Sequence, residues 1–297
     1  MPELPDVTLY VDAIARRARG ERLEDVRFAS PFVLRTVEPR KDAMVGRKID
    51  GVERIGKRIV LALEGDRFVV IHLMVAGRFR WDDAKGAKIP GRVGLCAFDL
   101  SSGTLILTEA SKKKRAQVHF VAGRESLRSF DRGGLDVMGA DLAAFRGALA
   151  RERHTLKRAL TDPRLFDGIG NAYSDEILHA AQLSPLKRTD QLSEEESARL
   201  FEATQSTLRT WIARLAAETG ESFPQNVTAF RPEMAVHGKH KQPCPVCGAP
   251  VQRIVYAENE SNYCARCQTG GKLLADRSLS RLLKDSWPKT IEELEGR

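Results

Sequence analysis

The first residues of the chain have the types and spacing needed for amine chemistry. Pro2 follows the initiator methionine, and Glu3 follows the proline. If Met1 is removed, the proline nitrogen becomes a secondary amine, and because α-amino groups titrate near pH ~8, a useful fraction is neutral at pH 7. Attack on a carbonyl such as a sugar aldehyde would give an iminium, which is an electron sink, and Glu3 could move the protons. The alternative interpretation is an N-terminal tail that begins a helix.

Four of the five cysteines form two C-x-x-C pairs, Cys244 with Cys247 and Cys264 with Cys267. This spacing fits a tetrahedral four-thiolate site for one structural Zn²⁺, with a redox pair as the alternative. Four thiolates leave no coordination position open for a substrate, so the pattern predicts a structural metal. A module this small should depend on that metal to fold. Cys96 lies in an apolar run and is predicted to be an inert core residue.

The charge balance indicates a polyanionic partner. The chain has 48 Lys and Arg against 40 Asp and Glu, and its pI of about 9.4 is typical of nucleic-acid-binding proteins. Lys112, Lys113, Lys114 and Arg115 form a basic run directly after an expected strand, either as a phosphate-contacting loop or as a solvated one.

The chain shows no targeting or membrane signal. It has no apolar run of 18 residues, and its N-terminus has no signal-peptide core. We therefore expect a cytoplasmic protein, nucleoid-associated if bacterial, with no membrane partner.

The elements expected near the N-terminus would place the amine at a helix start. Asp6 is a candidate N-cap for a helix over residues 7–18, which puts Pro2 and Glu3 at its positive dipole end. Short strands are expected next, a pattern that favours a β-sandwich or barrel, and they cover residues 22–28, 48–55, 58–63, 68–74, 91–100, 104–108 and 117–121. Lys57 falls in a turn between two of them, where an isolated lysine is ordinarily solvated.

A glycine-containing segment over residues 126–140 is predicted to be a linker, and the sequence after it becomes helical. Helices are expected over residues 141–152, 154–161, 174–181 and 194–219. Before the third helix, a proline and two glycines lead to Asn171 in a tight turn. Such a turn can present N–H groups and an amide to phosphate, or it can be an ordinary connecting loop. The two cysteine pairs would close a hairpin of residues 251–257 and 261–263.

Together these motifs resemble the formamidopyrimidine-DNA glycosylase / endonuclease VIII family. The similarity rests on Pro2-Glu3-Leu4-Pro5, on Lys57, on the segment from Gly168 to Glu176, and on the zinc ribbon that ends Cys264-Ala-Arg-Cys-Gln. Their order and spacing match across nearly the whole chain.

The resemblance implies an α+β multidomain fold. An N-terminal β-sandwich flanked by helices would cover residues 1–125, a helix–two-turn–helix domain residues 141–240, and a zinc-ribbon finger residues 241–297. Damaged DNA would lie in a basic cleft between the halves of a monomer. The implied activity is base-excision repair by a DNA glycosylase with AP-lyase activity, with an oxidised base as the expected lesion.

Residue by residue, the resemblance makes Pro2 the nucleophile at sugar C1′ and Glu3 the general acid/base. Lys57 would belong to the catalytic site and contact a phosphate near the lesion, and Lys157 and Asn171 would bind backbone phosphate from the helix–two-turn–helix domain. No catalytic metal would be required. The alternative is a non-catalytic or lyase-only protein of the same fold that binds damaged or abasic DNA.

The sequence also departs from the family pattern. Asn259, between two glutamates, stands where the ribbon tip should carry a phosphate-binding arginine. The loop over residues 108–116 has no aromatic side chain to fill the gap left by a flipped base, and Val75 replaces an expected methionine. We expect weaker finger contacts and altered reading of the opposite base.

Overall fold

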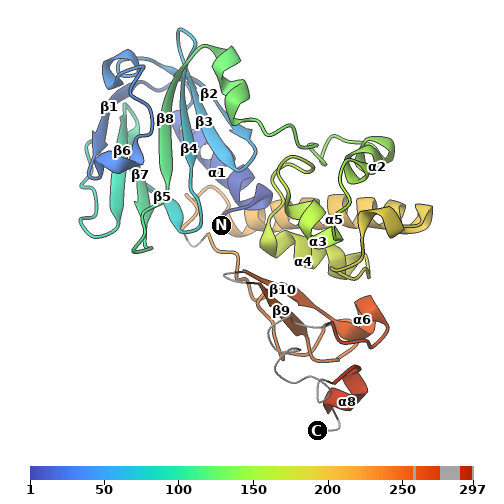
Figure 1. Cartoon of the computed structure of the whole chain (residues 1–297). Coiled ribbons are helices and arrows are strands. Elements are labelled where there is room, and N and C mark those ends of the chain that lie inside the picture. Colours follow the sequence, from blue (N-terminus) through green and yellow to red (C-terminus); the bar gives the residue numbers. More distant parts are fainter. Residues whose placement is uncertain (226, 257–258, 275–287, 296–297) are drawn as a thin grey trace. The chain divides into compact units, whose positions relative to one another are not determined.

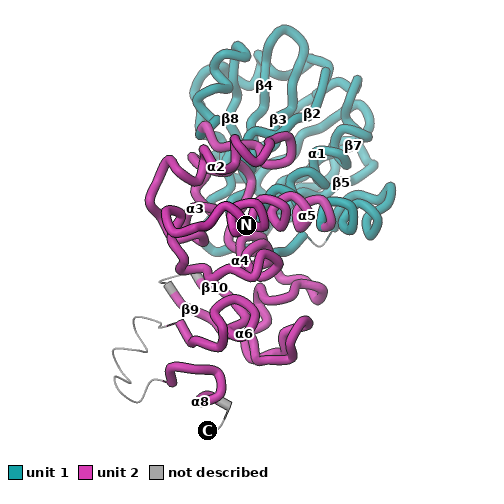
Figure 2. The backbone as a smooth tube through the Cα atoms, turned by 90° about the vertical axis from the view of Figure 1, so that its right-hand side faces the viewer, with its two compact units in different colours: residues 1–132, 211–229 teal, residues 133–210, 230–297 magenta. Residues whose placement is uncertain are grey.

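The computed structural model describes residues 1–225, 227–256, 259–274 and 288–295 (Figure 1). The chain forms two compact units, residues 1–132 with 211–229 and residues 133–210 with 230–297 (Figure 2). Among the described helices, none is both long enough and apolar enough to cross a membrane.

Two antiparallel four-stranded sheets build the first unit and confirm the expected β-sandwich. One sheet has the order β2 (Ile49–Ile55), β3 (Arg58–Leu63), β4 (Arg67–His72), β8 (Gln117–Ala122), and the other β1 (Leu23–Phe28), β6 (Gly94–Leu100), β7 (Gly103–Glu109), β5 (Gly77–Asp82). Apolar residues of both sheets share one core, for example Ile71 of β4 and Phe98 of β6. Strand β5 was not predicted, although its buried Phe79 lies between two arginines in the alternation of a half-buried strand.

Helix α1 spans Leu4–Ala18 and begins three residues earlier than predicted. Glu3, and not Asp6, is the N-cap. Asp6 instead closes a reciprocal capping box, in which its carboxylate accepts the backbone N–H of Glu3 at 3.0 Å. The apolar face of α1 packs on β2 and β3, with Tyr10 and Ile14 fully buried.

Short 3-10 helices complete the first unit and one turn of the second. They are η1 (Pro31–Val33), η2 (Lys41–Ala43), η3 (Arg124–Phe130) and η4 (Thr189–Gln191). The predicted linker therefore begins with helical structure, because Leu127 of η3 covers a small core on the outer face of β3 and β4 with Val60 and Phe68.

The second unit is helical and ends in the finger. Its elements are α2 (Leu142–Ala150), α3 (Leu156–Thr161), α4 (Asn171–Ala180), α5 (Glu194–Thr219), β9 (Gln252–Tyr256), β10 (Asn259–Tyr263), α6 (Ala265–Thr269) and α8 (Ile291–Glu295). Helix α5 has the predicted bounds and contributes residues to both units. Helix α4 begins at Asn171, three residues before the predicted start, because the glycine turn feeds directly into it.

Candidate active site and nucleic-acid-binding residues

The N-terminus is held by buried groups at the start of α1. Pro2 is buried, and Glu3 is 2% exposed. Burial lowers the pKa of the Met1 α-amino group, and the positive charges of Arg78 and Lys57 lower it further, against the opposing effect of Glu3. A lower pKa leaves more of an amine neutral near pH 7, which is the nucleophilic form. We expect these surroundings to act in the same direction on a Pro2 amine once Met1 is removed.

Arg78 is a neighbour of the N-terminus that was missing from the sequence-based site because strand β5 was missed. Its guanidinium donates to the carbonyl of Gly77 at 2.6 Å and to that of Val227. It therefore ties β5 to the segment that follows α5 within the same unit. Lys57 lies in the β2–β3 turn, where the preceding Gly56 has a φ of 62°.

The basic loop rests on a buried carboxylate. Glu109 is 1% exposed, and its side chain accepts the backbone N–H groups of Arg115 at 2.8 Å and Ala116 at 3.0 Å. Lys112, Lys113, Lys114 and Arg115 are all exposed. The ammonium of Lys114 also donates to the backbone carbonyls of Glu109 and Arg92. The four predicted phosphate-binding residues thus differ in whether their side chains already make hydrogen bonds within the protein.

The Asn171 turn is fixed through its main chain. The hydroxyl of Ser174 donates to the carbonyls of Gly170 at 2.6 Å and Asn171 at 3.1 Å. Lys157 Nζ donates to the same Asn171 carbonyl at 2.6 Å. The side-chain amide of Asn171 makes no hydrogen bond to the residues that the structure describes, which leaves it available to a ligand.

Lys157 lies largely inside the protein. Its side chain is 13% exposed, and its ammonium is 2.5 Å from a carboxylate oxygen of Asp175. Direct binding of phosphate by Lys157 stays a prediction, while its contacts in the structure support the turn from within.

Two adjacent carboxylates of α4, which the sequence did not single out, fix the segment before the finger. Glu176 accepts the backbone N–H groups of Ala235, Val236 and His237 at 2.7 to 2.9 Å, and burial raises its pKa. Asp175 accepts from Lys157 and lies 2.8 Å from His237 Nδ1. Burial raises the pKa of Asp175, but the Lys157 charge and the His237 hydrogen bond outweigh it and hold that pKa below its usual value.

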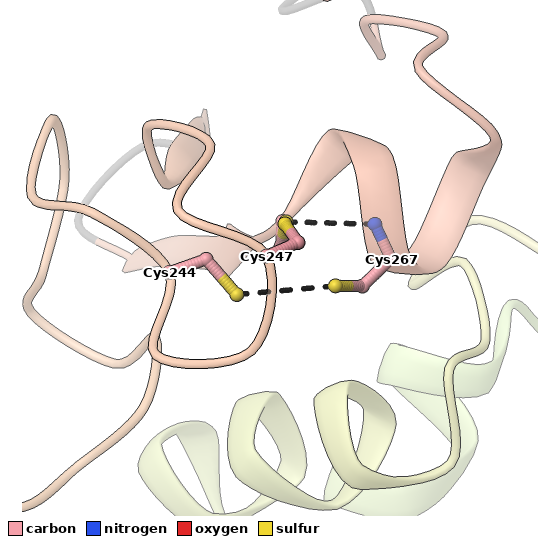
Figure 3. A group of neighbouring side chains, drawn as sticks. Cys244, Cys247 and Cys267 are labelled. Carbon is pink, nitrogen blue, oxygen red and sulfur yellow. Dashed lines mark hydrogen bonds between the residues drawn. The ribbon is translucent and has the colours of Figure 1, made fainter.

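The four cysteines converge as a metal site should. Their sulfur atoms all lie within 4.8 Å of one another, and Figure 3 shows Cys244 facing Cys267, at 3.9 Å. Zn–S bonds of ~2.3 Å in a tetrahedron place sulfur atoms ~3.8 Å apart, so the cluster fits Zn²⁺. Burial raises the pKa of Cys264 to about 11, and a bound cation must therefore displace protons. Cys96 is fully buried in the core of the first unit.

Comparison with known proteins gives matches along most of the chain. Sequence models of the formamidopyrimidine-DNA glycosylase N-terminal domain, of its H2TH domain, and of the zinc finger found in FPG and IleRS match residues 1–130, 137–222 and 241–270. The formamidopyrimidine-DNA glycosylase of Heliobacterium modesticaldum is 32% identical over 286 residues, which cover 90% of this chain and all of that protein. The chain belongs to the formamidopyrimidine-DNA glycosylase family.

Other relatives agree with this assignment. An uncharacterized formamidopyrimidine-DNA glycosylase-like protein of Mycobacterium tuberculosis is 41% identical over 164 residues, 55% of this chain and all of that protein. A Lactococcus lactis Fpg complex with abasic-site DNA aligns with a TM-score of 0.79 at 25% identity, over 90% of this chain and 99% of that one. MutM (Fpg) of Thermus thermophilus gives 0.75 at 29% identity, over 90% and 98%.

Family membership confirms the resemblance drawn from the sequence and the predicted α+β multidomain fold. The structure describes only part of the finger segment that departs from the family pattern. Residues 257 and 258 lie outside the described part of the chain, and for Asn259 only the backbone, paired with Tyr256, is described. The expected weak contact of the ribbon tip stays a prediction.

Proposed function

We propose that this chain is a base-excision-repair DNA glycosylase with AP-lyase activity. The arrangement of the N-terminus carries the proposal, because Pro2 and Glu3 are buried at the start of a helix, and burial, helped by the charges of Arg78 and Lys57, lowers the pKa of the N-terminal amine. Relatives named formamidopyrimidine-DNA glycosylase and Fpg complexes with Fapy-dG or abasic-site DNA support damaged DNA as the substrate.

The reaction needs one amine and one carboxylate. A flipped nucleotide exposes C1′, the Pro2 nitrogen bonds to C1′, and the bond to the base breaks, the base leaving with the electron pair and taking up the proton that the amine loses. Glu3 then protonates the ring oxygen as the sugar opens to the iminium. The iminium acidifies the C2′ protons, the Glu3 carboxylate takes one of them as the C3′–O bond breaks and the 3′ phosphate leaves with its electron pair, and water then hydrolyses the iminium to release the enzyme. Because the iminium is itself the electron sink, this route requires no catalytic metal.

Other groups would hold the DNA. We assign phosphate contacts to Lys57, to the exposed residues of the basic loop and to the Asn171 turn, since cations and free donors suit phosphate oxygens. The four cysteines would hold one structural Zn²⁺. Both catalytic groups come from one N-terminus, so a monomer suffices.

Borohydride trapping tests the proposal. Protein whose loss of Met1 is verified by mass should form a covalent adduct with an abasic-site duplex, because borohydride reduces the iminium to a stable amine. A matched protein with one extra residue before Pro2 should form none, because its proline nitrogen is an amide, whereas Pro2→Gly should keep some trapping. DNA binding without any adduct would instead indicate a non-catalytic protein that recognises damaged DNA.

A further inference from the structure

Asp175 lies at a junction of three other segments. It belongs to α4 and is 1% exposed. Its carboxylate is contacted by four side chains, Lys157 of α3 at 2.5 Å, His237 at 2.8 Å, and Ser261 and Asn262 of β10 at 3.1 and 3.4 Å. A buried carboxylate is tolerated only with such compensation.

One of these partners connects Asp175 to the Asn171 turn. The Lys157 ammonium that pairs with Asp175 also donates to the Asn171 carbonyl at 2.6 Å. The position of this carbonyl at the first residue of α4 therefore depends on the ion pair. The Asn171 amide, which is proposed to meet phosphate, is carried by this main chain.

Two of the remaining partners connect Asp175 to the finger, and the third, His237, belongs to the segment before it. Ser261 and Asn262 are the third and fourth residues of β10 and come shortly before Cys264. The ring of His237 stacks on Phe230 with 5.5 Å between centroids. Asp175 is thus shared by the turn and by the hairpin that the cysteines close.

Glu176 is a natural comparison for Asp175. It is equally part of α4 and also buried, at 6% exposed. Its carboxylate accepts only backbone N–H groups of residues 235–237 among the described contacts. Glu176 therefore anchors the segment before the finger without touching Lys157 or the Asn171 turn.

We infer that Asp175 is a positioning residue for DNA binding, which holds the Asn171 turn and the finger hairpin in a fixed position relative to each other. It acts on the turn through Lys157 and on the hairpin through Ser261 and Asn262. The inference rests on the proposed function, because it takes DNA as the ligand of both parts. Loss of the carboxylate charge leaves the Lys157 ammonium buried without a counter-charge, so the turn and the hairpin should no longer share one geometry.

The decisive experiment compares D175N with E176Q on an abasic-site duplex, at a temperature well below the melting point of each. D175N should raise KM about tenfold, equivalent to ~1.4 kcal/mol, with kcat within about twofold and one zinc per chain retained. The salt dependence of its DNA binding should flatten by about one unit of log–log slope for each phosphate that the variant no longer binds. E176Q should lower Tm but leave KM and the salt slope near wild type.

A double-mutant cycle shows whether Asp175 acts through the turn. In an N171A background, D175N should raise KM less than it does in the wild-type chain, because the amide that it positions is already gone and only its effect through the finger hairpin remains. If D175N does not fold, K157M/D175N removes the ion pair without leaving a buried charge, and it should show the same rise in KM. Additive effects in the cycle, or a D175N protein with lowered Tm and unchanged KM and slope, would overturn the inference. A wild-type chain that traps no abasic-site DNA would refute the proposed function instead.

Discussion

The two units hold their proposed functional groups in opposite ways. In the first, Pro2 and Glu3 occupy a chain terminus, and the capping box with Asp6 is the device that orders them. In the second, the Asn171 turn is fixed by the buried side chain of Lys157, which pairs with Asp175. Asp175 in turn contacts the finger. Under the proposed function, catalysis would depend on a few groups at the chain end, and DNA binding would depend on a buried network of side chains.

This difference predicts different consequences of mutation. A change at the terminus should act on the rate of excision and leave affinity intact. A change in the second unit should act on affinity, because its groups position phosphate-binding atoms far along the chain from Pro2. Exposed Lys112 and Lys113 belong to the first unit but should behave as binding residues, since they have no link to the amine in the described contacts.

The largest effect is expected from Glu3→Gln. General acid–base catalysis contributes roughly 10²- to 10⁴-fold, so the single-turnover rate of excision should fall by that range with Kd for the duplex unchanged. Asp6→Asn is the matched control, because it disturbs the same capping box without removing the acid. An equal loss of rate in both variants would mean that Glu3 acts only as a helix cap.

Zinc removal should come next and should affect the second unit alone. A chelator should release one zinc per chain and unfold the finger from about residue 240 onward, because the small core around Val236, Ala249 and Val251 is built on the cysteines. Affinity for DNA should fall, and hydrogen exchange in the β-sandwich should stay slow. Full activity of a protein with no metal would contradict this.

The sequence predicted elements whose periodicity is strong. The strands from Arg58–Leu63 and Gln117–Ala122 alternate or run apolar between clear breaks, and α5 has the full repeat of a long amphipathic helix. The cysteine site was also predictable, since its spacing is set by the coordination geometry itself. These features depend on local residues or on a fixed metal geometry.

The polar groups that organise the site could not be predicted in this way. Glu109 and Asp175 are of residue types that are ordinarily exposed, and only the tertiary packing reduces their exposure to 1%. Their partners are a loop turn in one case and three distant segments in the other. A buried carboxylate leaves no periodic signal in the sequence. Sequence patterns therefore identify the residues that would contact DNA, but they miss the buried groups that hold those residues in place.

A smaller effect is expected from the basic loop. Lys112→Ala with Lys113→Ala should flatten the salt dependence of DNA binding by about one unit of slope for each phosphate that is no longer bound, with no change in the single-turnover rate at saturation. Lys114→Ala is the comparison, because its ammonium is engaged with backbone carbonyls and its removal should alter loop order more than slope. An unchanged slope in the double variant would identify the loop as a solvated surface.

The smallest effect separates the electrostatic role of Lys57 from its proposed phosphate contact. Burial is the main cause of the lowered N-terminal pKa, and Lys57 contributes the least among the named causes. Its positive charge disfavours the protonated amine, so Lys57→Met should raise the amine pKa and move the ascending limb of the single-turnover rate to slightly higher pH.

The plateau rate above that limb should be kept when DNA is saturating, while KM rises because the variant binds one phosphate fewer. Lys88→Met, an exposed lysine that is not among the charges acting on the amine, should leave the limb where it is. A limb that moves to lower pH in Lys57→Met, or moves equally in both variants, would show that the lysine in the β2–β3 turn does not tune the nucleophile.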